Sequence, residues 1–245
     1  MSKKVALVTG GSTGIGSAIA IQLAENGLQV VITGRTESTL KTSAGQHANI
    51  SYIVADVAKP EDVKKTIAHM KSTFGRLDVL VNNAGIAPSV PFEQFTLDHF
   101  DNLYNTNVRG LVDITHKALP LLKKSKGNII NITSVVADKP MPGFLIYSST
   151  KGAVITLTKG LAKELAPFGI RVNAVSPGPI ETPLFDKIGM NEKEMENMAG
   201  AISQMVPLGR FGTVDEVASV VTYLASEQAS YVTGAQYKVD GGFGA

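Results

Sequence analysis

The 245-residue sequence contains no cysteine and no tryptophan. Without cysteine the chain can form no disulfide, hold no thiolate-bound metal and use no cysteine nucleophile. Histidine is scarce as well, with four residues at positions 47, 69, 99 and 116, and their spacing fits no metal-binding motif. We therefore expect no metal site. A chain without disulfides is compatible with a reducing compartment, and we expect a cytoplasmic location.

Long apolar runs and a strong excess of charge are also missing. The sequence has no run of about twenty apolar residues that could span a membrane, and no signal peptide precedes its first apolar segment. Its formal net charge of +2 is too small to indicate nucleic acid or an anionic membrane as the main partner. The remaining composition, 44% hydrophobic and 18% charged residues, is typical of a globular protein with a sizeable core.

Short β-branched runs alternate with longer amphipathic stretches along the chain. Strands are predicted at residues 5–9, 30–33, 50–55, 79–83, 128–133, 171–176 and 236–239. Helices are predicted at 15–27, 37–46, 60–74, 96–124, 147–166 and 213–225. This alternation predicts an α/β fold, a Rossmann-like doubly wound parallel sheet of about seven strands with helices on both faces. Short connections predict a single domain over residues 1–245, with a substrate-covering excursion near 183–205.

A glycine-rich segment, TGGSTGIG at residues 9–16, follows the first predicted strand. Its Gly10, Ser12 and Gly14 fit the G-x-S-x-G pattern of a hydrolase nucleophile elbow. The same segment fits a loop whose backbone N–H groups cradle phosphates at a helix N-terminus. A nucleophile elbow normally follows a later, central strand, and no histidine here lies in a motif that follows a strand. The position of the segment therefore favours a phosphate loop, with Ser12 and Thr13 near the phosphates.

The ends of the second and third predicted strands bear on the choice of nucleotide. Residues 34–36 (Gly-Arg-Thr) offer no carboxylate to bind ribose hydroxyls, whereas Arg35 can form a charge-assisted hydrogen bond with a 2′-phosphate. This favours NADP(H). The alternative is that Arg35 is only a solvated charge in a loop, and NAD(H) is then possible. Asp56, followed by Val57, either reaches an adenine or only closes a turn.

Tyr147 and Lys151 lie four residues apart on a predicted helix and therefore share one face. The pKa of tyrosine is normally about 10, and a nearby ammonium lowers it. A tyrosine whose pKa is lowered in this way can give or take the proton of an alcohol. Ser134 follows the fifth predicted strand, where its hydroxyl can hydrogen-bond a substrate oxygen. The plainer alternatives are an exposed helix pair and a capping serine. Ser148 and Lys151 also fit the S-x-x-K pattern of β-lactamases, but the accompanying S-D-N and K-T-G motifs are absent.

Together these segments resemble the short-chain dehydrogenase/reductase family, over nearly the whole chain and in the family's order. TGGSTGIG resembles the cofactor loop, NNAG at residues 82–85 the motif after the fourth strand, and YSSTK at 147–151 the tyrosine–lysine pair. The resemblance implies four catalytic residues, Asn107, Ser134, Tyr147 and Lys151. It implies cofactor contacts, besides Tyr147 and Lys151, by Gly10, Ser12, Thr13, Gly14, Ile15, Gly16, Arg35, Thr36, Asp56, Val57, Asn83, Ala84, Gly85, Pro177, Gly178, Ile180 and Thr182.

The resemblance also implies the roles of these residues. Tyr147 would be the general acid or base, and Ser134 would hold and polarise the substrate oxygen. Lys151 would lower the pKa of Tyr147 and bind the nicotinamide ribose, and Asn107 would hold a water that links Lys151 to solvent. The residues expected along the cofactor are Asn83 and Gly85, and those expected at its carboxamide end are Ile180 and Thr182.

The expected activity is NAD(P)H-dependent interconversion of a ketone and a secondary alcohol, with a small-molecule carbonyl or alcohol as substrate. Reduction of 3-oxoacyl thioesters and oxidation of sugars or polyols are the alternatives, and a non-catalytic NADP-binding regulator is disfavoured by the complete catalytic set. Thr13 stands where some NADP-dependent members carry a basic residue. Family members of this pattern form homotetramers through helices corresponding to 96–124 and 147–166. An apolar substrate pocket is expected from Pro140, Met141, Phe144, Leu145, Leu184, Phe185 and Met190.

Overall fold

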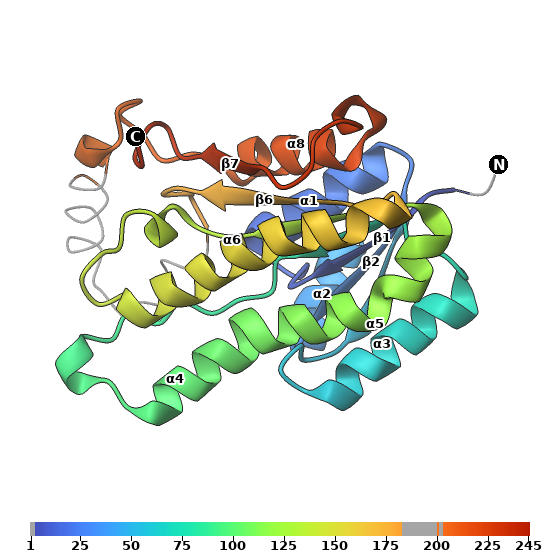
Figure 1. Cartoon of the computed structure of the whole chain (residues 1–245), viewed down its shortest axis with the longest axis horizontal. Coiled ribbons are helices and arrows are strands. Elements are labelled where there is room, and N and C mark those ends of the chain that lie inside the picture. Colours follow the sequence, from blue (N-terminus) through green and yellow to red (C-terminus); the bar gives the residue numbers. More distant parts are fainter. Residues whose placement is uncertain (1–2, 183–199, 201–202) are drawn as a thin grey trace.

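A single twisted sheet forms the centre of the computed structural model, which describes residues 3–182, 200 and 203–245 (Figure 1). Its seven strands are all parallel and lie in the order β3-β2-β1-β4-β5-β6-β7. The chain crosses from one half of the sheet to the other between β3 and β4, so β1 and β4 flank the crevice where such folds bind ligands. The strands are β1 (Val5–Thr9), β2 (Gln29–Gly34), β3 (Ile50–Val54), β4 (Val79–Asn82), β5 (Asn128–Ile132), β6 (Arg171–Pro177) and β7 (Gln236–Val239).

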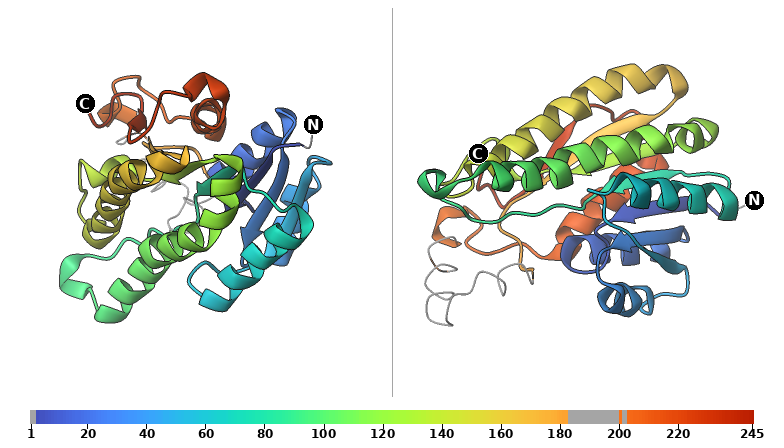
Figure 2. Two further views of the ribbon diagram at one scale, coloured as in Figure 1. Left: turned by 45° about the vertical axis from the view of Figure 1, so that its right-hand side comes forward. Right: turned by 90° about the horizontal axis from the view of Figure 1, so that it is seen from below.

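Helices cover both faces of the sheet, as Figures 1 and 2 show. One face packs against α1 (Gly14–Glu25), α8 (Val214–Ala225) and Leu40 of α2 (Glu37–Ala44). The other face packs against α3 (Pro60–Thr73), α5 (Gly110–Ser125) and α6 (Leu145–Leu165). The predicted α/β architecture, a doubly wound parallel sheet with helices on both faces, is confirmed.

The strands are apolar on both faces because both faces are covered. In β1, Ala6 and Val8 lie in the core under α1 and α8, whereas Val5 and Leu7 lie in the core under α3 and α5. Each valine or leucine among them contributes about 1.5–3 kcal/mol when it is fully buried. The sheet is therefore a rigid base for the loops at its carboxyl edge.

The predicted helix over 96–124 is interrupted. In its place the structure has α4 (Leu97–Tyr104), one π-helical segment, η2 (Asn105–Arg109), and then α5. A π-helical turn inserts one extra residue into a helical path and is common at functional sites. The amphipathic pattern did not reveal this turn, because π and α turns differ by a fraction of a residue in their period.

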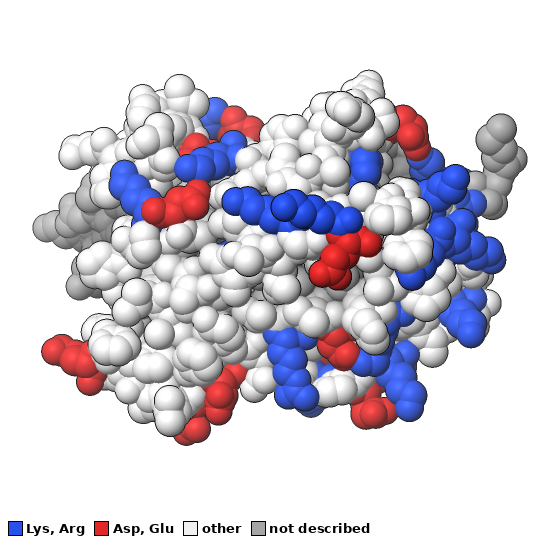
Figure 3. All heavy atoms as spheres, in the orientation of Figure 1, with Lys and Arg blue, Asp and Glu red and all other residues white. Residues whose placement is uncertain are grey.

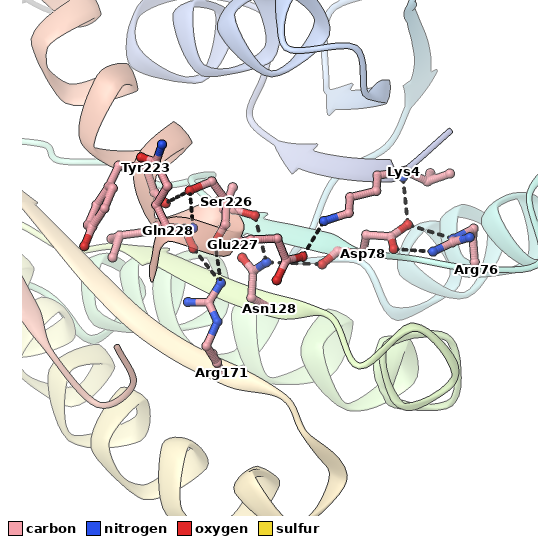
Figure 4. Close-up of polar contacts among 12 residues, drawn as sticks. Lys4, Arg76, Asp78, Asn128, Arg171, Tyr223, Ser226, Glu227 and Gln228 are labelled. Atoms are coloured by element: carbon pink, nitrogen blue, oxygen red, sulfur yellow. Dashed lines mark hydrogen bonds and ion pairs between the residues drawn. The ribbon is translucent and has the colours of Figure 1, made fainter. Parts of the chain in front are cut away.

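The amino edge of the sheet is closed by a polar network (Figure 4). The Arg171 guanidinium donates hydrogen bonds to the carbonyl oxygens of Leu224 at 2.8 Å and Val232 at 3.2 Å, so it ties the end of α8 to the loop before β7. Arg76 pairs with Asp78, whose carboxylate also accepts a hydrogen bond from the backbone N–H of Val5 at 2.8 Å. These charged groups lie at the end of the strands opposite to the glycine loop.

Two predictions concern parts of the chain that the structure describes incompletely or not at all. The excursion near 183–205 lies mostly outside the described residues, and so do Leu184, Phe185 and Met190. Within the part of the chain that is described, no helix combines the length and the apolar character needed to cross a bilayer.

Candidate active site

The predicted site residues lie along the carboxyl edge of the sheet and at the start of the helices that follow it. They occupy the loop after β1, the ends of β2 and β3, the loop after β4, the π-turn η2, the loop after β5, the first two turns of α6, and the segment after β6. Asn107, Ser134, Tyr147 and Lys151 are brought together near the middle of this edge, where β4 and β5 end, beside Gly85.

The glycine loop turns sharply from β1 into α1. Gly10 and Gly14 have φ angles of +65° and +55°, which side chains disfavour. A Cβ at Gly16 would lie 2.2 Å from the carbonyl oxygen of Gly10, so the first turn of α1 packs directly on the loop. A Cβ at Gly14 would meet only the Thr182 side chain, at 3.6 Å. Gly16 therefore closes the turn, whereas the Cβ position at Gly14 faces Thr182 at ordinary van der Waals distance.

Asn83, which follows β4, is hydrogen-bonded to this loop. Its side-chain amide donates hydrogen bonds to the carbonyl oxygens of Thr9 and Gly10, both at 3.0 Å. The buried hydroxyl of Thr9 in turn accepts hydrogen bonds from the backbone N–H groups of Asn83 and Ala84, at 3.1 and 3.0 Å. The Asn83 side chain thus braces the loop, and its expected place along a cofactor stays a prediction. Sequence reasoning missed Thr9, although a hydroxyl at the end of a buried strand is a usable signal.

The N-terminus of α1 fits a phosphate group. Its N-cap residue, Thr13, forms no side-chain cap, and the first turn of α1 carries no acidic residue. Backbone N–H groups at a helix N-terminus lack intrahelical acceptors and carry a partial positive charge. A diphosphate can bind to these N–H groups.

The ends of β2 and β3 border the same region. Arg35 is exposed, and among the described residues it has neither an ion-pair nor a hydrogen-bond partner. Thr36 is the N-cap of α2, also without a side-chain cap. One oxygen of the Asp56 carboxylate accepts a hydrogen bond from the backbone N–H of Ala58 at 2.9 Å. With that oxygen Asp56 closes a turn, which is the second of the two roles expected for it. The backbone carbonyl of Val57 abuts Gly110, where a Cβ would lie 2.7 Å from it.

Ser134, Tyr147 and Lys151 form the polar centre of the site. Ser134 begins the short helical turn η3 (Val135–Ala137), and its side chain is hydrogen-bonded with Tyr147. The Lys151 ammonium is buried, donates a hydrogen bond to the Ile132 carbonyl oxygen at 2.9 Å, and lies 5.7 Å from the centre of the Tyr147 ring. Helix α6 therefore presents a phenol and an amine to the serine that follows β5.

Burial dominates the ionisation of both α6 groups. It raises the pKa of Tyr147 to about 12, although the hydrogen bond with Ser134 acts in the opposite direction. It lowers the pKa of Lys151 to about 8. The expectation that Lys151 lowers the pKa of Tyr147 stays a prediction; in the protein without ligands the pKa is raised overall, because desolvation of the phenolate is the largest effect. At neutral pH Tyr147 is a proton donor.

Asn107 is buried in the π-turn, and both ends of its side-chain amide are hydrogen-bonded within the protein. Its oxygen accepts a hydrogen bond from the Ile86 N–H, and its nitrogen donates to the Ile86 carbonyl, each at 2.9 Å. The same nitrogen donates to the Thr150 hydroxyl at 3.1 Å. This side chain therefore positions the loop after β4 against α6, and the expected water at Asn107 stays a prediction. Thr150, inside the YSSTK segment, is a residue that sequence reasoning missed.

The segment after β6 completes the edge. Gly178 packs so closely on the chain end that a Cβ there would lie 2.6 Å from the Cα of Asp240. The Ile180 side chain is buried in the core under α1 and α8, so only its backbone can face a ligand. Thr182 lies across from Gly14. Pro177 is the last residue of β6. In the described ranges no group of three or more histidine, aspartate or glutamate side chains is placed to hold a metal ion.

Comparison with known proteins agrees with this geometry. A family model described as enoyl-(acyl carrier protein) reductase matches residues 10–244. The chain is 38% identical over 244 residues to 3-oxoacyl-(acyl-carrier-protein) reductase FabG of Thermotoga maritima, covering 98% of this chain and 97% of that protein. It is also 38% identical over 240 residues to L-fucose dehydrogenase of Bos taurus, covering 98% of this chain and 88% of that protein.

A solved structure extends the likeness to three dimensions. The crystal structure of 3-ketoacyl-(acyl-carrier-protein) reductase from Brucella melitensis complexed with NADH aligns with a TM-score of 0.92 at 36% identity. The alignment covers 99% of this chain and 98% of that one.

The doubly wound fold, with a serine, a tyrosine and a lysine gathered at its carboxyl edge, defines an oxidoreductase of the Rossmann type. The matching family model and the relatives identify it further. The chain belongs to the short-chain dehydrogenase/reductase family.

Proposed function

We propose that the protein is an NAD(P)H-dependent reductase that converts a ketone to a secondary alcohol, with Tyr147 as its general acid. One observation carries this proposal: the Tyr147 hydroxyl is hydrogen-bonded with Ser134, beside a buried lysine, at the same sheet edge as an uncapped helix N-terminus. A proton donor, a second hydroxyl and an anion site in this arrangement suit reduction of a carbonyl held between them.

The chain's own residues have separable roles in this reaction. Tyr147, protonated at neutral pH, donates a proton to the carbonyl oxygen as it gains negative charge. Ser134 donates a hydrogen bond to the same oxygen and fixes its position. Lys151 places a positive charge near the phenol, which favours the phenolate that remains after proton transfer. Asn107 is a positioning residue, because its amide joins the loop after β4 to Thr150 of α6.

A bound nicotinamide dinucleotide supplies the hydride in this reaction. The backbone of residues 10–16 and the first turn of α1 would hold its diphosphate. Lys151 would hold ribose hydroxyls, the loops after β3 and β4 would border the adenine and ribose, and the segment 177–182 would border the nicotinamide. Arg35 is exposed and unpaired among the described residues, and this supports a preference for NADP(H), whose 2′-phosphate it can bind.

The substrate is a small carbonyl compound. The 3-oxoacyl thioester alternative is favoured by the relatives from Thermotoga and Brucella, which are named as reductases of such thioesters. The L-fucose dehydrogenase relative favours the sugar alternative. Phe144 lies edge-on to the Tyr147 ring with their centres 6.3 Å apart, so an apolar wall borders the acid. This wall favours a substrate with an apolar chain over a sugar.

The homotetramer and the cytoplasmic location stay predictions. The homotetramer is supported by the face that carries α4, α5 and α6, where uncharged side chains cover wide areas (Figure 3). Val112 and Leu145 are exposed on this face. A shallow hollow of about 530 Å³ lies on it, lined by Pro60, Tyr104, Asn105, Val108, Arg109, Val112, Asp113 and His116.

The proposal is tested by following NADPH and NADH absorbance, in parallel, with acetoacetyl thioesters, β-ketoesters and aryl ketones, and by following reduction of NADP⁺ or NAD⁺ with aldoses. We expect NADPH oxidation with acetoacetyl thioesters or β-ketoesters. Tight NADPH binding without turnover of any substrate would instead support the non-catalytic alternative.

A further inference from the structure

The chain end packs against the loop that carries Ser134. Phe243 is 2% exposed and forms a small apolar cluster with Val135 and Val206, and Met141 packs against the cluster. Val135 directly follows Ser134, and Met141 lies near the end of the same loop. This cluster is separate from the two large cores on the faces of the sheet. Phe243 therefore packs against residues 134–141, which we call the Ser134 loop.

A lysine of the same loop reinforces this contact. The Lys139 ammonium donates a hydrogen bond to the Phe243 carbonyl oxygen at 2.9 Å. It also lies 4.8 Å from the centre of the Phe243 ring, within the range of a cation–π interaction. The loop and the chain end thus contact each other through both the side chain and the backbone of Phe243.

Strand β7 provides a second anchor for the loop. The Asp138 carboxylate accepts a hydrogen bond from Gln236 at 3.0 Å and pairs with Lys238 at 3.2 Å. Gln236 also donates to the Ser176 hydroxyl at 3.0 Å, and Ser176 is hydrogen-bonded to Thr133, the residue before Ser134. Contacts from the chain end therefore reach the loop on both sides of Ser134.

The chain end is itself a folded turn, so it can act as a support. The two oxygens of the Asp240 carboxylate accept hydrogen bonds from the backbone N–H groups of Gly242 and Gly244, at 3.0 and 2.9 Å. Lys238 donates to the Gly244 carbonyl oxygen at 2.9 Å. Gly241 packs on Val206, where a Cβ would lie 2.7 Å from a Val206 methyl carbon. These bonds fix the direction in which Phe243 points.

We propose that Phe243 is a positioning residue for the reaction: through Val135 and Lys139 it holds the loop that aims the Ser134 hydroxyl at Tyr147. This inference rests on the proposed function, because it concerns the serine that orients the substrate carbonyl. Within the loop, the Ser134 carbonyl oxygen accepts a hydrogen bond from the Ala137 N–H at 3.1 Å, whereas the Ser134 hydroxyl accepts only a long one, 3.4 Å, from the Val136 N–H in addition to its contact with Tyr147. The loop turn thus holds the Ser134 backbone, and the contacts of the turn with the chain end add to what positions the Ser134 hydroxyl.

The test compares three variants. F243A removes the ring, and F243L keeps a buried apolar side chain. L122A is the matched control, because Leu122 is fully buried in the core under α5, away from the Ser134 loop. For each variant we would measure kcat and KM for the best ketone, the Kd for NADPH, and hydrogen–deuterium exchange of peptides covering residues 9–16 and 133–141 in the protein without cofactor.

We expect F243A to lower kcat by about tenfold or more with KM and the NADPH Kd within about twofold, because Ser134 acts on the transition state. Exchange should become faster in residues 133–141 and stay unchanged in residues 9–16. F243L should recover most of kcat. L122A should keep kcat and exchange in 133–141 near those of the unmodified protein, although its melting temperature falls.

An unchanged kcat in F243A, or an equal loss of kcat in L122A, would overturn the proposal. Unchanged exchange in residues 133–141 of F243A would overturn it as well. Should F243A fail to fold, F243L decides, and normal kcat together with normal exchange in that variant counts against the proposal. Absence of turnover in the unmodified protein would refute the proposed function, and exchange would then still decide whether Phe243 holds the loop.

Discussion

Tyr147 and Lys151 lie one turn apart on α6, and burial drives both of them toward the neutral form. The pKa of Tyr147 rises to about 12 and that of Lys151 falls to about 8. A tyrosine that keeps its proton at neutral pH is ready to act as an acid, which is the role that ketone reduction requires. In the direction of alcohol oxidation Tyr147 must first lose its proton. A positive charge bound nearby must then lower the pKa of Tyr147 further than ketone reduction requires.

The lowered pKa of Lys151 predicts how stability depends on pH. Between about pH 8 and pH 10.5 the unfolded chain keeps the proton that the folded protein has released, so this group makes the free energy of unfolding rise with pH. The full effect of this shift is at most about 3 kcal/mol. Below about pH 8 both states are protonated and burial of the ammonium is fully unfavourable.

Replacing Lys151 with methionine removes this contribution. We expect K151M to gain most stability, relative to the unmodified protein, at pH 7, and to lose that advantage steadily toward pH 10. Urea unfolding at a series of pH values measures the difference between the two proteins. Stability curves that stay parallel across this range would show that Lys151 is not desolvated as described.

We expect Arg35 to determine the choice between NADPH and NADH. A hydrogen bond to a charged phosphate contributes about 1.5–3 kcal/mol, so R35A should weaken NADPH binding by at least about tenfold. NADH has no 2′-phosphate, and its Kd should change by less than about twofold. Fluorescence titration with both cofactors makes the comparison, and equal losses for NADPH and NADH would contradict the assignment.

The glycine loop shows how an element depends on residues far away in the sequence. Thr9 of β1 and Asn83 after β4 exchange hydrogen bonds across the crevice and fix the loop before any ligand binds. Gly16 completes this packing, because a Cβ there would meet the backbone of Gly10. The loop is therefore held in its binding shape by the sheet beneath it.

Gly16→Ala should distort this element. The added Cβ would lie 2.2 Å from the Gly10 carbonyl oxygen, and backbone cannot move aside as a flexible side chain can. We expect a loss of stability of about 2 kcal/mol or more and a clear loss of NADPH affinity. Gly160→Ala is the control, since it lies in α6 with nothing within 4 Å of an added Cβ, and it should be neutral or slightly stabilising. Similar melting temperatures for both variants would refute the role of Gly16.

The sequence predicted the elements better than the contacts between them. All seven strands and the helices around them follow from hydrophobic periodicity, because both faces of the sheet are buried. The π-turn that carries Asn107 could not be predicted, since its period differs little from that of an α-helix. The Asn83–Thr9 and Asn107–Thr150 contacts join residues separated by tens of positions, and only the folded sheet brings them together.

The candidate site residues could be predicted from the sequence, but their ionisation could not. Ser134, Tyr147 and Lys151 stand in recognisable motifs, whereas a pKa depends on how deeply the fold buries a group. The contribution of Phe243 was hidden as well, because nothing in the last residues of the sequence links them to a serine more than a hundred positions earlier.

The whole molecule has two contrasting ends and one face with a broad uncharged area. The carboxyl edge of the sheet carries the candidate site, and the amino edge carries the network of Arg76, Asp78 and Arg171 (Figure 4). On the face that carries α4, α5 and α6, uncharged side chains cover a broad area toward the left, while lysines and arginines gather across the middle and at the right (Figure 3). Apolar area of this kind is typical of an interface between subunits.

We therefore expect a homotetramer in solution. Light scattering should give about four times the chain mass of 25.8 kDa. Val112→Glu, at an exposed apolar position of α5, should reduce that mass because it places a charge inside the interface. A monomer at all concentrations would contradict this assembly and leave the proposed chemistry untouched.

Tyr147 is the residue that we propose to transfer the proton. The most direct test is turnover of Tyr147→Phe with NADPH and the ketone that the unmodified protein reduces fastest, measured beside NADPH binding by the same variant. General acid–base catalysis contributes about 10²–10⁴-fold, so we predict that kcat falls below about 1% while the NADPH Kd stays within about twofold. Turnover above about a tenth of the original, with binding intact, would show that another group supplies the proton and would contradict the account.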